Sequence, residues 1–337
     1  MAQTLAIKYR PKTFDDVVEQ SSTKIILKQQ LESGEIKNAY LFVGSAGTGK
    51  TTCARIFANE VNRGQGNPIE LDAASNNSVD DVREIINQAK TKSLDSEYKV
   101  FIIDECHSLS NAAWQAMLKI IEEPPAKSIF ILCTTESQKI PKTILSRVQR
   151  FDFQRISQEG ISIRLADIYD MEIGISTDKQ NKICEALEYI AKIADGGMRD
   201  ALTLLDKCLA YSDDLTVDNV VKALGTVDYE VMIDLSMAII EKQTTRVVDI
   251  IENLHGQGKD LKQFIKQYIQ FILDVTKYHI GCDWRYITMP ETYEDKIKKC
   301  DGIIDLLDTM LNLNNEIKYS QSSKYDIEAI LLLECVK

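Results

Sequence analysis

A phosphate-binding loop is the first chemistry that the sequence offers. The stretch GSAGTGKT (44–51) matches the pattern G-x-x-x-x-G-K-[S/T] in full, after an apolar run and before a helical pattern. Glycines let backbone N–H groups turn toward a phosphate, and the N-terminus of the next helix adds a favourable dipole. Lys50 is expected to reach the β- and γ-phosphates, and Thr51 to hold Mg²⁺. The sequence thus predicts an ATP and Mg²⁺ site that includes Gly44, Ala46, Gly47, Thr48, Gly49, Lys50, Thr51 and Thr52.

An acidic pair supplies the second half of this chemistry. The run VFIIDECH (100–107) brings Asp104 and Glu105 to the end of an apolar strand. Asp104 is expected to bind the metal, and Glu105 to polarise the attacking water. A solvated strand end is the plain alternative, but the complete phosphate loop upstream favours ATP hydrolysis. Cys106 and His107 are interpreted as structural, because adjacent residues of a strand point to opposite faces.

The same letters also fit the D-E-x-H box of helicases. That class needs a second domain of the nucleotide-binding type with its own arginine motif. No parallel-sheet pattern follows residue 155. A helicase is therefore kept only as the alternative function.

The elements that must position these residues are strands alternating with helices. Apolar runs predict strands at 39–44, 68–73, 99–105 and 128–135, with helices starting at Lys50 and spanning 79–90 and 111–123. Continuous apolar runs are typical of parallel strands buried on both faces. The strands stop after Phe153, and the remainder has helical periodicity. The predicted class is α/β plus all-α, in three domains: 1–156 (P-loop ATPase), 157–226 (helical lid) and 227–337 (helical C-terminal domain), with Gly225 and the TVDY stretch as a linker.

Composition narrows the class of protein. The 337 residues carry a net charge of -11, which argues against coating nucleic acid by bulk electrostatics but leaves room for a local basic groove. The 8 cysteines are scattered and not grouped with the 3 histidines, so neither a disulfide framework nor a zinc site is expected. Such thiols suit a reducing cytoplasm. The run AILLLECV (329–336) is too short for a membrane span and is expected to be a buried helix face.

Seven motifs in order carry a family resemblance: KYRPKTFDDVVEQ, GSAGTGKTT, ELDAASNN, IIDECHSLS, LKIIEEPP, ILCTTESQKIPKTILSR and GGMRDALTLLD. From about residue 5 to 210 the chain resembles the bacterial DNA polymerase III gamma/tau family, the AAA+ ATPase motors of the sliding-clamp loader. The stretches DAASNN and GGMRDAL separate it from the related replication factor C small subunits. The resemblance implies an AAA+ domain, a lid, and a C-terminal collar that holds subunits together.

The resemblance also implies how the adenine is bound. In this family the YRP segment borders the adenine pocket. Here that segment is Tyr9, Arg10 and Pro11, with Val17 and Val18 nearby.

Two further residues gain roles toward the nucleotide of their own chain. The threonine that ends the ILCTT strand is the family's sensor for the γ-phosphate; we expect Thr135 rather than Thr134. A hydroxyl suits this role because it can hydrogen-bond both water and phosphate. Arg199 of GGMRDAL is implied to project from the lid toward the nucleotide. Without the motif, Arg199 would be an ordinary surface residue near a helix N-terminus.

Two arginines in TILSRVQRF (143–151) differ in what the resemblance implies. In the family's S-R-C motif the arginine completes the site of a neighbouring subunit, and here that motif is Ser146-Arg147-Val148. An arginine finger supplied in trans contributes roughly 10³-fold or more in rate. Arg147 is therefore a predicted catalytic residue, and Arg150 is interpreted as an ordinary solvated residue.

Two departures from the family pattern bear on cofactors and size. Family members insert a four-cysteine zinc module where this chain has only the loop NRGQGN (62–67), so no zinc is predicted. The chain also stops at Lys337 without the long tail of tau-type proteins. It is therefore expected to be a short, gamma-like form.

The expected partners are other clamp-loader subunits in a hetero-oligomeric ring, expected to be a pentamer, together with the sliding clamp and primer–template DNA; no membrane is expected. DNA contacts are assigned to Asn76, Asn77, Arg83 and Lys119, although Arg83 and Lys119 could simply be solvated helix residues. The predicted function is an ATPase motor that opens the clamp and loads it onto DNA. The non-enzyme alternative, a structural subunit with little ATPase activity, does not explain the intact Lys50, Thr51, Asp104 and Glu105.

Overall fold

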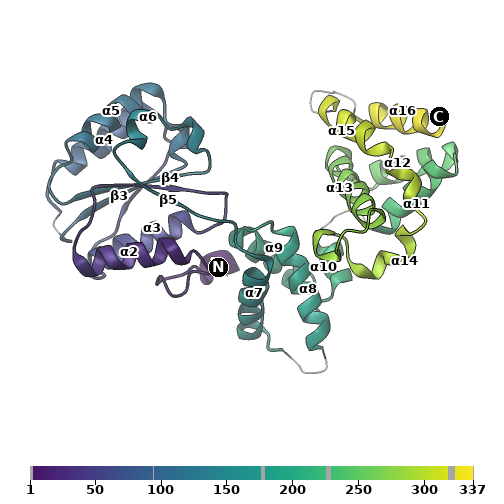
Figure 1. Cartoon of the computed structure of the whole chain (residues 1–337), viewed down its shortest axis with the longest axis horizontal. Coiled ribbons are helices and arrows are strands. Elements are labelled where there is room, and N and C mark those ends of the chain that lie inside the picture. Colours follow the sequence, from purple (N-terminus) through teal and green to yellow (C-terminus); the bar gives the residue numbers. More distant parts are fainter. Residues whose placement is uncertain (1–2, 94, 176–178, 225–228, 318–322, 337) are drawn as a thin grey trace. The chain divides into compact units, whose positions relative to one another are not determined.

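The computed structural model describes residues 3–93, 95–175, 179–224, 229–317 and 323–336 (Figure 1). The chain forms two compact units. The first is Met1–Gly174 with Ala194–Asp206, and the second is Ile175–Ile193 with Lys207–Lys337.

A five-stranded parallel sheet forms the centre of the first unit. Its strands are β1 (Ala39–Val43), β2 (Ile69–Asp72), β3 (Lys99–Asp104), β4 (Ser128–Thr134) and β5 (Gln149–Asp152), in the order β2-β3-β4-β1-β5. β1 and β4 are buried along their whole length, as their continuous apolar sequences predict. Because all strands run in the same direction, the loops that follow β1, β3 and β4 meet at one edge of the sheet. The phosphate loop, the acidic pair and the predicted threonine sensor all follow these strands.

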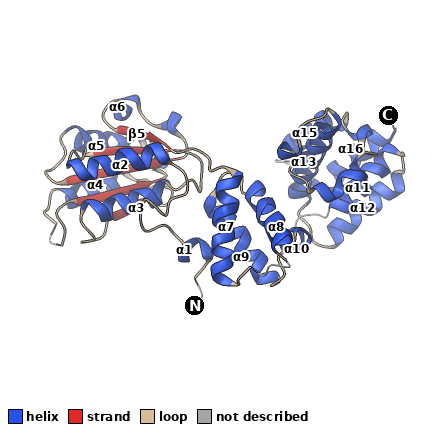
Figure 2. Ribbon diagram, turned by 60° about the horizontal axis from the view of Figure 1, so that its bottom comes forward, coloured by secondary structure: helices blue, strands red, loops and turns tan. Residues whose placement is uncertain are grey.

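Helices cover both faces of this sheet (Figures 1 and 2). On one face lie α4 (Val79–Ala89), α5 (Asn111–Glu122) and α6 (Lys142–Leu145), and on the other α2 (Ser21–Ser33) and α3 (Lys50–Val61). Successive residues of β1 divide between the two cores: Leu41 packs with α4 and α5, whereas Tyr40 and Phe42 pack with α2 and α3. Burying such a side chain contributes about 1.5–3 kcal/mol, so each helix layer is held by its own set of strand residues.

The strand β5 and the helix α2 of the first unit were not predicted. The strand β5 has a single buried residue, Phe151, because it is the edge strand of the sheet, and it therefore lacks an apolar run. The helix α2 buries only Thr23 and Leu27, which makes its periodicity weak. The predicted strand 99–105 ends one residue earlier than expected, at Asp104.

The first unit also contains the short helix α1 (Leu5–Lys8), the 3₁₀ turns Cys106–Ser108 and Ser137–Lys139, and α7 (Gln158–Glu172). The α7 N-terminus is capped by Ser157, whose hydroxyl accepts from the Gly160 N–H and also bonds Glu19. The helix α9 (Met198–Tyr211) begins in this unit.

The second unit is helical throughout its described part. Its helices are α8 (Gln180–Ile193), α10 (Val217–Leu224), α11 (Tyr229–Ile240), α12 (Thr244–Gly256), α13 (Leu261–His279), α14 (Glu294–Ile297), α15 (Leu306–Glu316) and α16 (Ser323–Val336), with 3₁₀ turns at Trp284–Tyr286, Glu291–Tyr293 and Asp301–Ile303. Its core is built around α13, where Phe264, Tyr268 and Phe271 are fully buried. In α16, Ile327, Leu331 and Cys335 are buried whereas Leu333 and Val336 are exposed, so this helix buries one face, as predicted for the run AILLLECV. Within the residues that the structure describes, no helix is long and apolar enough to cross a membrane.

A buried carboxylate links α13 to the segment that follows it. Asp274 is 1% exposed and accepts hydrogen bonds from the N–H groups of Thr288 and Met289, both at 3.0 Å. Gln270 also donates to it at 3.1 Å. Burial raises the pKa of Asp274, and these hydrogen bonds oppose the rise.

The three-domain division stays a prediction. The helices assigned to the lid are divided between the two units, with α7 in the first and α8 and α10 in the second. The predicted linker at 225–228 lies outside the described residues.

Candidate nucleotide site

A cavity of about 470 Å³ lies beside the loop that joins β1 to α3. Five segments of the first unit line it: the N-terminal segment, the phosphate loop with α3, the end of β3, the segment at α7, and the start of α9. The predicted residues that line it are Tyr9, Arg10, Pro11, Val17, Val18, Ala46, Gly47, Thr48, Gly49, Lys50, Thr51, Thr52, Asp104, Glu105 and Arg199. Of the predicted ATP-site residues, all of which the structure describes, only Gly44, Thr135 and Arg147 lie outside the lining.

Glycine is required in the phosphate loop by close backbone contacts. A Cβ on Gly44 would lie 2.5 Å from the Phe153 carbonyl oxygen, so no larger residue fits there. Gly47 has φ +73°, and a Cβ on it would lie 3.0 Å from the Gly197 Cα. The Met198 N–H donates to the Gly47 carbonyl at 3.0 Å. The loop is therefore bonded directly to the residues that begin α9.

The lysine and threonine of the loop have defined partners. The Lys50 Nζ donates to the carbonyls of Gly44 and Ser45, both at 2.8 Å. Burial lowers the Lys50 pKa, while the carboxylates of Glu105 and Asp104 oppose this. The Thr51 hydroxyl donates to Asp104 Oδ2 at 2.8 Å. A hydroxyl and a carboxylate side by side form a pair of oxygen donors of the kind that Mg²⁺ prefers.

Glu105 stands where β3 ends, in a left-handed conformation with φ 45° and ψ 43°. Such a conformation costs a non-glycine residue of order 1–3 kcal/mol and is concentrated at functional sites. The Thr135 hydroxyl donates to Glu105 Oε2 at 3.1 Å, whereas Thr134 is fully buried and bonds the Glu136 N–H. Of the two threonines, Thr135 is the one that contacts the acidic pair.

Cys106 and His107 lie in a 3₁₀ turn and not on a strand, so the alternation of strand faces does not apply to them and that premise was wrong. Cys106 is fully buried, and burial raises its pKa well above the ordinary value, so it is no nucleophile at neutral pH. His107 contacts Glu105, with 3.3 Å between Nδ1 and Oε2.

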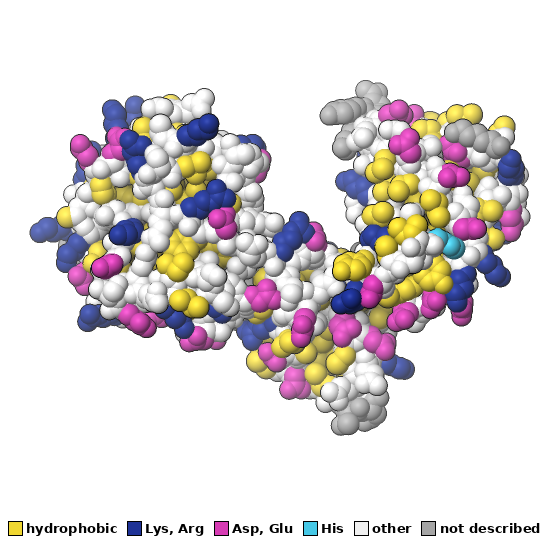
Figure 3. All heavy atoms as spheres, in the orientation of Figure 1, with side chains coloured by type: hydrophobic (Ala, Val, Ile, Leu, Met, Phe, Trp, Pro, Cys, Tyr) yellow, Lys and Arg dark blue, Asp and Glu magenta, His cyan; other side chains and the backbone are white. Residues whose placement is uncertain are grey.

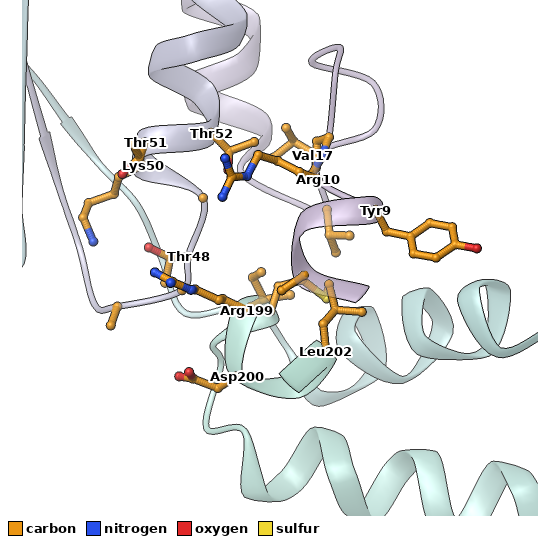
Figure 4. A pocket seen from close by; sticks show the side chains of 18 of the residues that line it. Tyr9, Arg10, Val17, Thr48, Lys50, Thr51, Thr52, Arg199, Asp200 and Leu202 are labelled. Carbon is orange, nitrogen blue, oxygen red and sulfur yellow. The ribbon is translucent and has the colours of Figure 1, made fainter. Parts of the chain in front are cut away.

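Tyr9 contributes to the cavity differently from what the resemblance suggests. Its hydroxyl donates to Glu172 Oε1 of α7 at 2.5 Å, and this bond raises the Tyr9 pKa. Figure 4 shows the Tyr9 ring directed away from the other labelled side chains, and Arg199 directed toward Thr48 of the loop.

Sequence reasoning missed several lining residues. They are Ala6, Asp16, Arg55, Ile156, Arg164, Met198, Asp200 and Leu202. Arg55 had a detectable signal, because it lies four residues after Thr51 on the same face of α3. It forms a bidentate pair with Glu70, with N–O distances of 2.7 and 2.5 Å. Ile156 and Arg164 come from a distant segment and had no local signal.

Arg147 lies away from the cavity. Its guanidinium donates to the Thr143 carbonyl at 2.8 Å and pairs with Glu122 Oε1 at 2.8 Å. It comes just before Gln149, which is paired with Tyr40 near the start of β1. Arg147 is therefore at the amino edge of the sheet, and the phosphate loop is at the carboxyl edge. Arg150 pairs with Asp152 at 2.6 Å.

The four residues assigned to DNA are all exposed or half-buried at the surface. Arg83 is paired with Asp80 at 2.8 Å. The N-terminus of α4 already carries Asp80 and Asp81 in its first turn, with a capping box at Ser78. The N-terminus of α5 has no acidic residue in its first turn, and its cap, Ser110, donates its N–H to the Asn77 carbonyl at 3.1 Å. Figure 3 shows basic and acidic side chains intermingled on the visible face of the first unit.

No group of three or more His, Cys, Asp or Glu side chains able to hold a metal ion occurs in the described ranges.

Family models match most of the chain. The family described as "DNA polymerase III, delta subunit" matches residues 67–157. "DNA polymerase III clamp loader subunit, ATPase lid domain" matches 164–214, and "DNA polymerase III subunits gamma and tau domain III" matches 215–329.

Curated relatives agree with these models. The chain is 35% identical to DNA polymerase III subunit tau of Bacillus subtilis (strain 168), covering 99% of this chain and 63% of that protein. It is 31% identical to DNA polymerase III subunit gamma of Buchnera aphidicola subsp. Acyrthosiphon pisum, covering 98% of each. Against the Escherichia coli (strain K12) subunit tau, identity is 36% over 76% of this chain and 42% of that protein. The chain thus spans less than two thirds of both tau proteins.

Among solved structures, the Thermotoga maritima RuvB Holliday junction branch migration motor is similar, with a TM-score of 0.52 and 23% identity over 75% of this chain and 86% of that one. This likeness concerns the fold alone. With the parallel sheet and the helical remainder, it confirms the predicted AAA+ P-loop fold.

Proposed function

Because the chain belongs to the DNA polymerase III gamma/tau family, we propose that it is an ATP-driven motor subunit of a sliding-clamp loader. The observation that carries the proposal is the meeting of Lys50, Thr51, Asp104 and Glu105 at one cavity, while Arg147 lies at the opposite edge of the sheet. The four residues at the cavity support hydrolysis of ATP. The distant position of Arg147 supports hydrolysis that depends on a neighbouring subunit.

The residues around the cavity have distinct roles in this proposal. Lys50 and Arg199 place positive charge against the phosphates, and Lys50 exchanges its two carbonyl acceptors for phosphate oxygens. Thr51 and Asp104 are the residues that would hold Mg²⁺, which neutralises charge on the phosphates when bound. Glu105, restrained by the Thr135 hydroxyl, orients the attacking water and accepts its proton.

The topology of the sheet supports the assignment of Arg147 to a neighbouring site. The 5 residues of β1 separate the two edges by about 16 Å, at about 3.3 Å per residue. This is farther than an arginine side chain extends, so Arg147 cannot reach the phosphates held by its own loop. The ion pair with Glu122 is half-exposed, and such pairs contribute only about 0–1 kcal/mol, so it gives way easily to a phosphate.

The partners follow from the family. Other clamp-loader subunits complete a ring, proposed to be a hetero-oligomeric pentamer in the cytoplasm, that holds the sliding clamp and encloses primer–template DNA. The second unit would form the collar. Leu333 and Val336, exposed on α16, and the hydrophobic side chains visible on this unit in Figure 3 support such an interface.

DNA contact is proposed at the N-terminus of α5, next to Asn76 and Asn77. Helix N-termini bind phosphates through free N–H groups and the helix dipole, and no acidic residue opposes this in the first turn of α5. Arg83 and Lys119 add positive charge, although Arg83 is partly neutralised by Asp80.

The test is the ATPase rate of the chain assembled with its partner subunits, measured with and without clamp and primed DNA. Stimulation by clamp and DNA together is expected. A rate that DNA and clamp leave unchanged would contradict the loader, and strand displacement without a clamp would instead favour a helicase. Tight ATP binding with no hydrolysis in the complete assembly would favour a structural subunit.

A further inference from the structure

A histidine lies between two carboxylates directly beside the proposed hydrolytic glutamate. The His107 Nδ1 is 3.3 Å from Glu105 Oε2, and its Nε2 is 3.3 Å from Glu136 Oε1. Nδ1 is also 3.1 Å from the Thr134 hydroxyl. The His107 side chain is only 14% exposed, so the ring is held by protein on most sides.

The far side of this ring is well anchored. Glu136 pairs with Lys139 at 2.8 Å, and that bond lowers the Glu136 pKa, so Glu136 is a carboxylate at neutral pH. A carboxylate accepts only, so the ring holds both Glu136 and Glu105 when each of its two nitrogens carries a hydrogen. The Glu136 N–H donates to the Thr134 hydroxyl at 3.0 Å, which ties the anchor to the end of β4.

The Nδ1 side of the ring faces Glu105, the residue proposed to orient the attacking water. Glu105 Oε2 is contacted by the Thr135 hydroxyl at 3.1 Å and by His107 at 3.3 Å. A general base must be within hydrogen-bond reach of its proton, and a carboxylate with free side-chain torsions spends little time in that position. Two neighbours on different segments restrict it to one position.

We propose that His107 is a positioning residue that holds the Glu105 carboxylate in place, anchored on its other side by Glu136. This rests on the proposed ATPase function and adds to it. His107 does not contact the phosphates in this arrangement; it acts through Glu105. Its loss should therefore lower the rate of hydrolysis and leave ATP binding nearly unchanged.

Three substitutions of His107 distinguish the effect of its contact with Glu105 from that of its contact with Glu136. His107→Ala removes both contacts. In His107→Asn the amide nitrogen takes the place of Nδ1 and can still reach Glu105. In His107→Gln it takes the place of Nε2 and reaches Glu136 instead. His255→Ala, at an exposed position in the second unit, is the matched control.

The experiment measures kcat and KM for ATP in the complete assembly with clamp and primed DNA. We expect His107→Ala to lower kcat about tenfold with KM changed by less than about twofold, since a positioned base contributes a factor of about 10²–10⁴ and only its positioning is lost. His107→Asn should recover most of the rate, whereas His107→Gln should not. His255→Ala should have the rate of the parent.

Several results would overturn the proposal. An unchanged kcat in His107→Ala, a loss confined to KM, or equal rates for the Asn and Gln variants would each do so. If His107→Ala fails to fold, the Asn and Gln pair still decides, because both keep a polar side chain. Failure of the proposed function has a separate signature, in which the parent assembly itself shows no hydrolysis or no stimulation by clamp and DNA.

Discussion

The bond between the phosphate loop and the start of α9 can be tested by adding one methyl group at Gly47. Gly47 has φ +73°, where an L-residue costs about 1–2 kcal/mol. Its new Cβ would lie 3.0 Å from the Gly197 Cα, 3.3 Å from the Gly197 carbonyl carbon and 3.5 Å from the Arg199 nitrogen. All three are backbone atoms, so no side-chain rotation relieves the contact.

The cost has two parts. The first is the left-handed conformation itself. The second comes from separating the two segments, which stretches the 3.0 Å bond from the Met198 N–H to the Gly47 carbonyl; such a bond contributes about 0.5–1.5 kcal/mol. Together they give about 2–3 kcal/mol. The conformational part is the same with and without ATP, so only the separation of the loop from the start of α9 should lower ATP affinity, by roughly 2- to 12-fold at about 1.4 kcal/mol per factor of ten.

The matched control is Gly64→Ala. Gly64 has φ +79°, and apart from its two chain neighbours no described residue lies within 4 Å of the point that an added Cβ would occupy. This variant therefore has the conformational cost without the contact. Calorimetric titration with ATP and thermal unfolding of both variants are the measurements. Gly64→Ala should lose about 1–2 kcal/mol of stability and bind ATP like the parent. If Gly47→Ala also binds ATP like the parent, the loop and α9 do not depend on each other.

Three other changes have equally definite outcomes. Lys50→Ala should reduce ATP binding of its own chain at least about tenfold, as measured by titration, since it removes the cation nearest the phosphates. In an assembly where one subunit carries Arg147→Ala, that subunit should still bind ATP while hydrolysis at the adjacent site falls roughly 10³-fold; Arg150→Ala is the control, and loss of the variant's own ATP binding would refute action in trans. Burial raises the Asp274 pKa above 3.8, so the folded protein binds this proton more tightly than the unfolded chain does. The stability that Asp274 contributes should therefore fall as pH rises from 3.8 through the folded pKa. Over that range, denaturant unfolding should show the free energy of unfolding of Asp274→Asn rising relative to that of the parent. A difference between the two proteins that stays constant with pH would refute this.

The fold was predictable where burial is complete. β1 and β4 are buried along their length and appear in the sequence as continuous apolar runs. β5 is an edge strand with one buried residue, Phe151, and the force that pairs it with β1 is backbone hydrogen bonding, which leaves no trace in composition. The weak periodicity of α2 has a similar cause, because this helix buries only a narrow stripe.

The site was predictable where chemistry is local in sequence. Lys50 and Thr51 come from one loop, and Asp104 and Glu105 are adjacent, so a short pattern specifies them. Residues such as Arg164 reach the cavity only through the packing of α7, and no local pattern encodes that. The direction of the Tyr9 ring depends likewise on Glu172, which is far along the chain.

If Arg147 serves a neighbouring site as proposed, its place at the edge of the sheet opposite the phosphate loop requires such chains to associate head-to-tail. Unless the ring closes, one terminal subunit has a pocket with no arginine and the other has an arginine with no pocket to serve. In assemblies that mix intact and variant subunits, loss of Lys50 and loss of Arg147 should then have different effects. In that arrangement, a copy without Lys50 should lose only its own ATP hydrolysis and still supply Arg147 to its neighbour. A copy without Arg147 should slow hydrolysis in an intact neighbour and not in itself. Excess of the second kind should act as a dominant inhibitor, with a severity set by its place in the order of subunits.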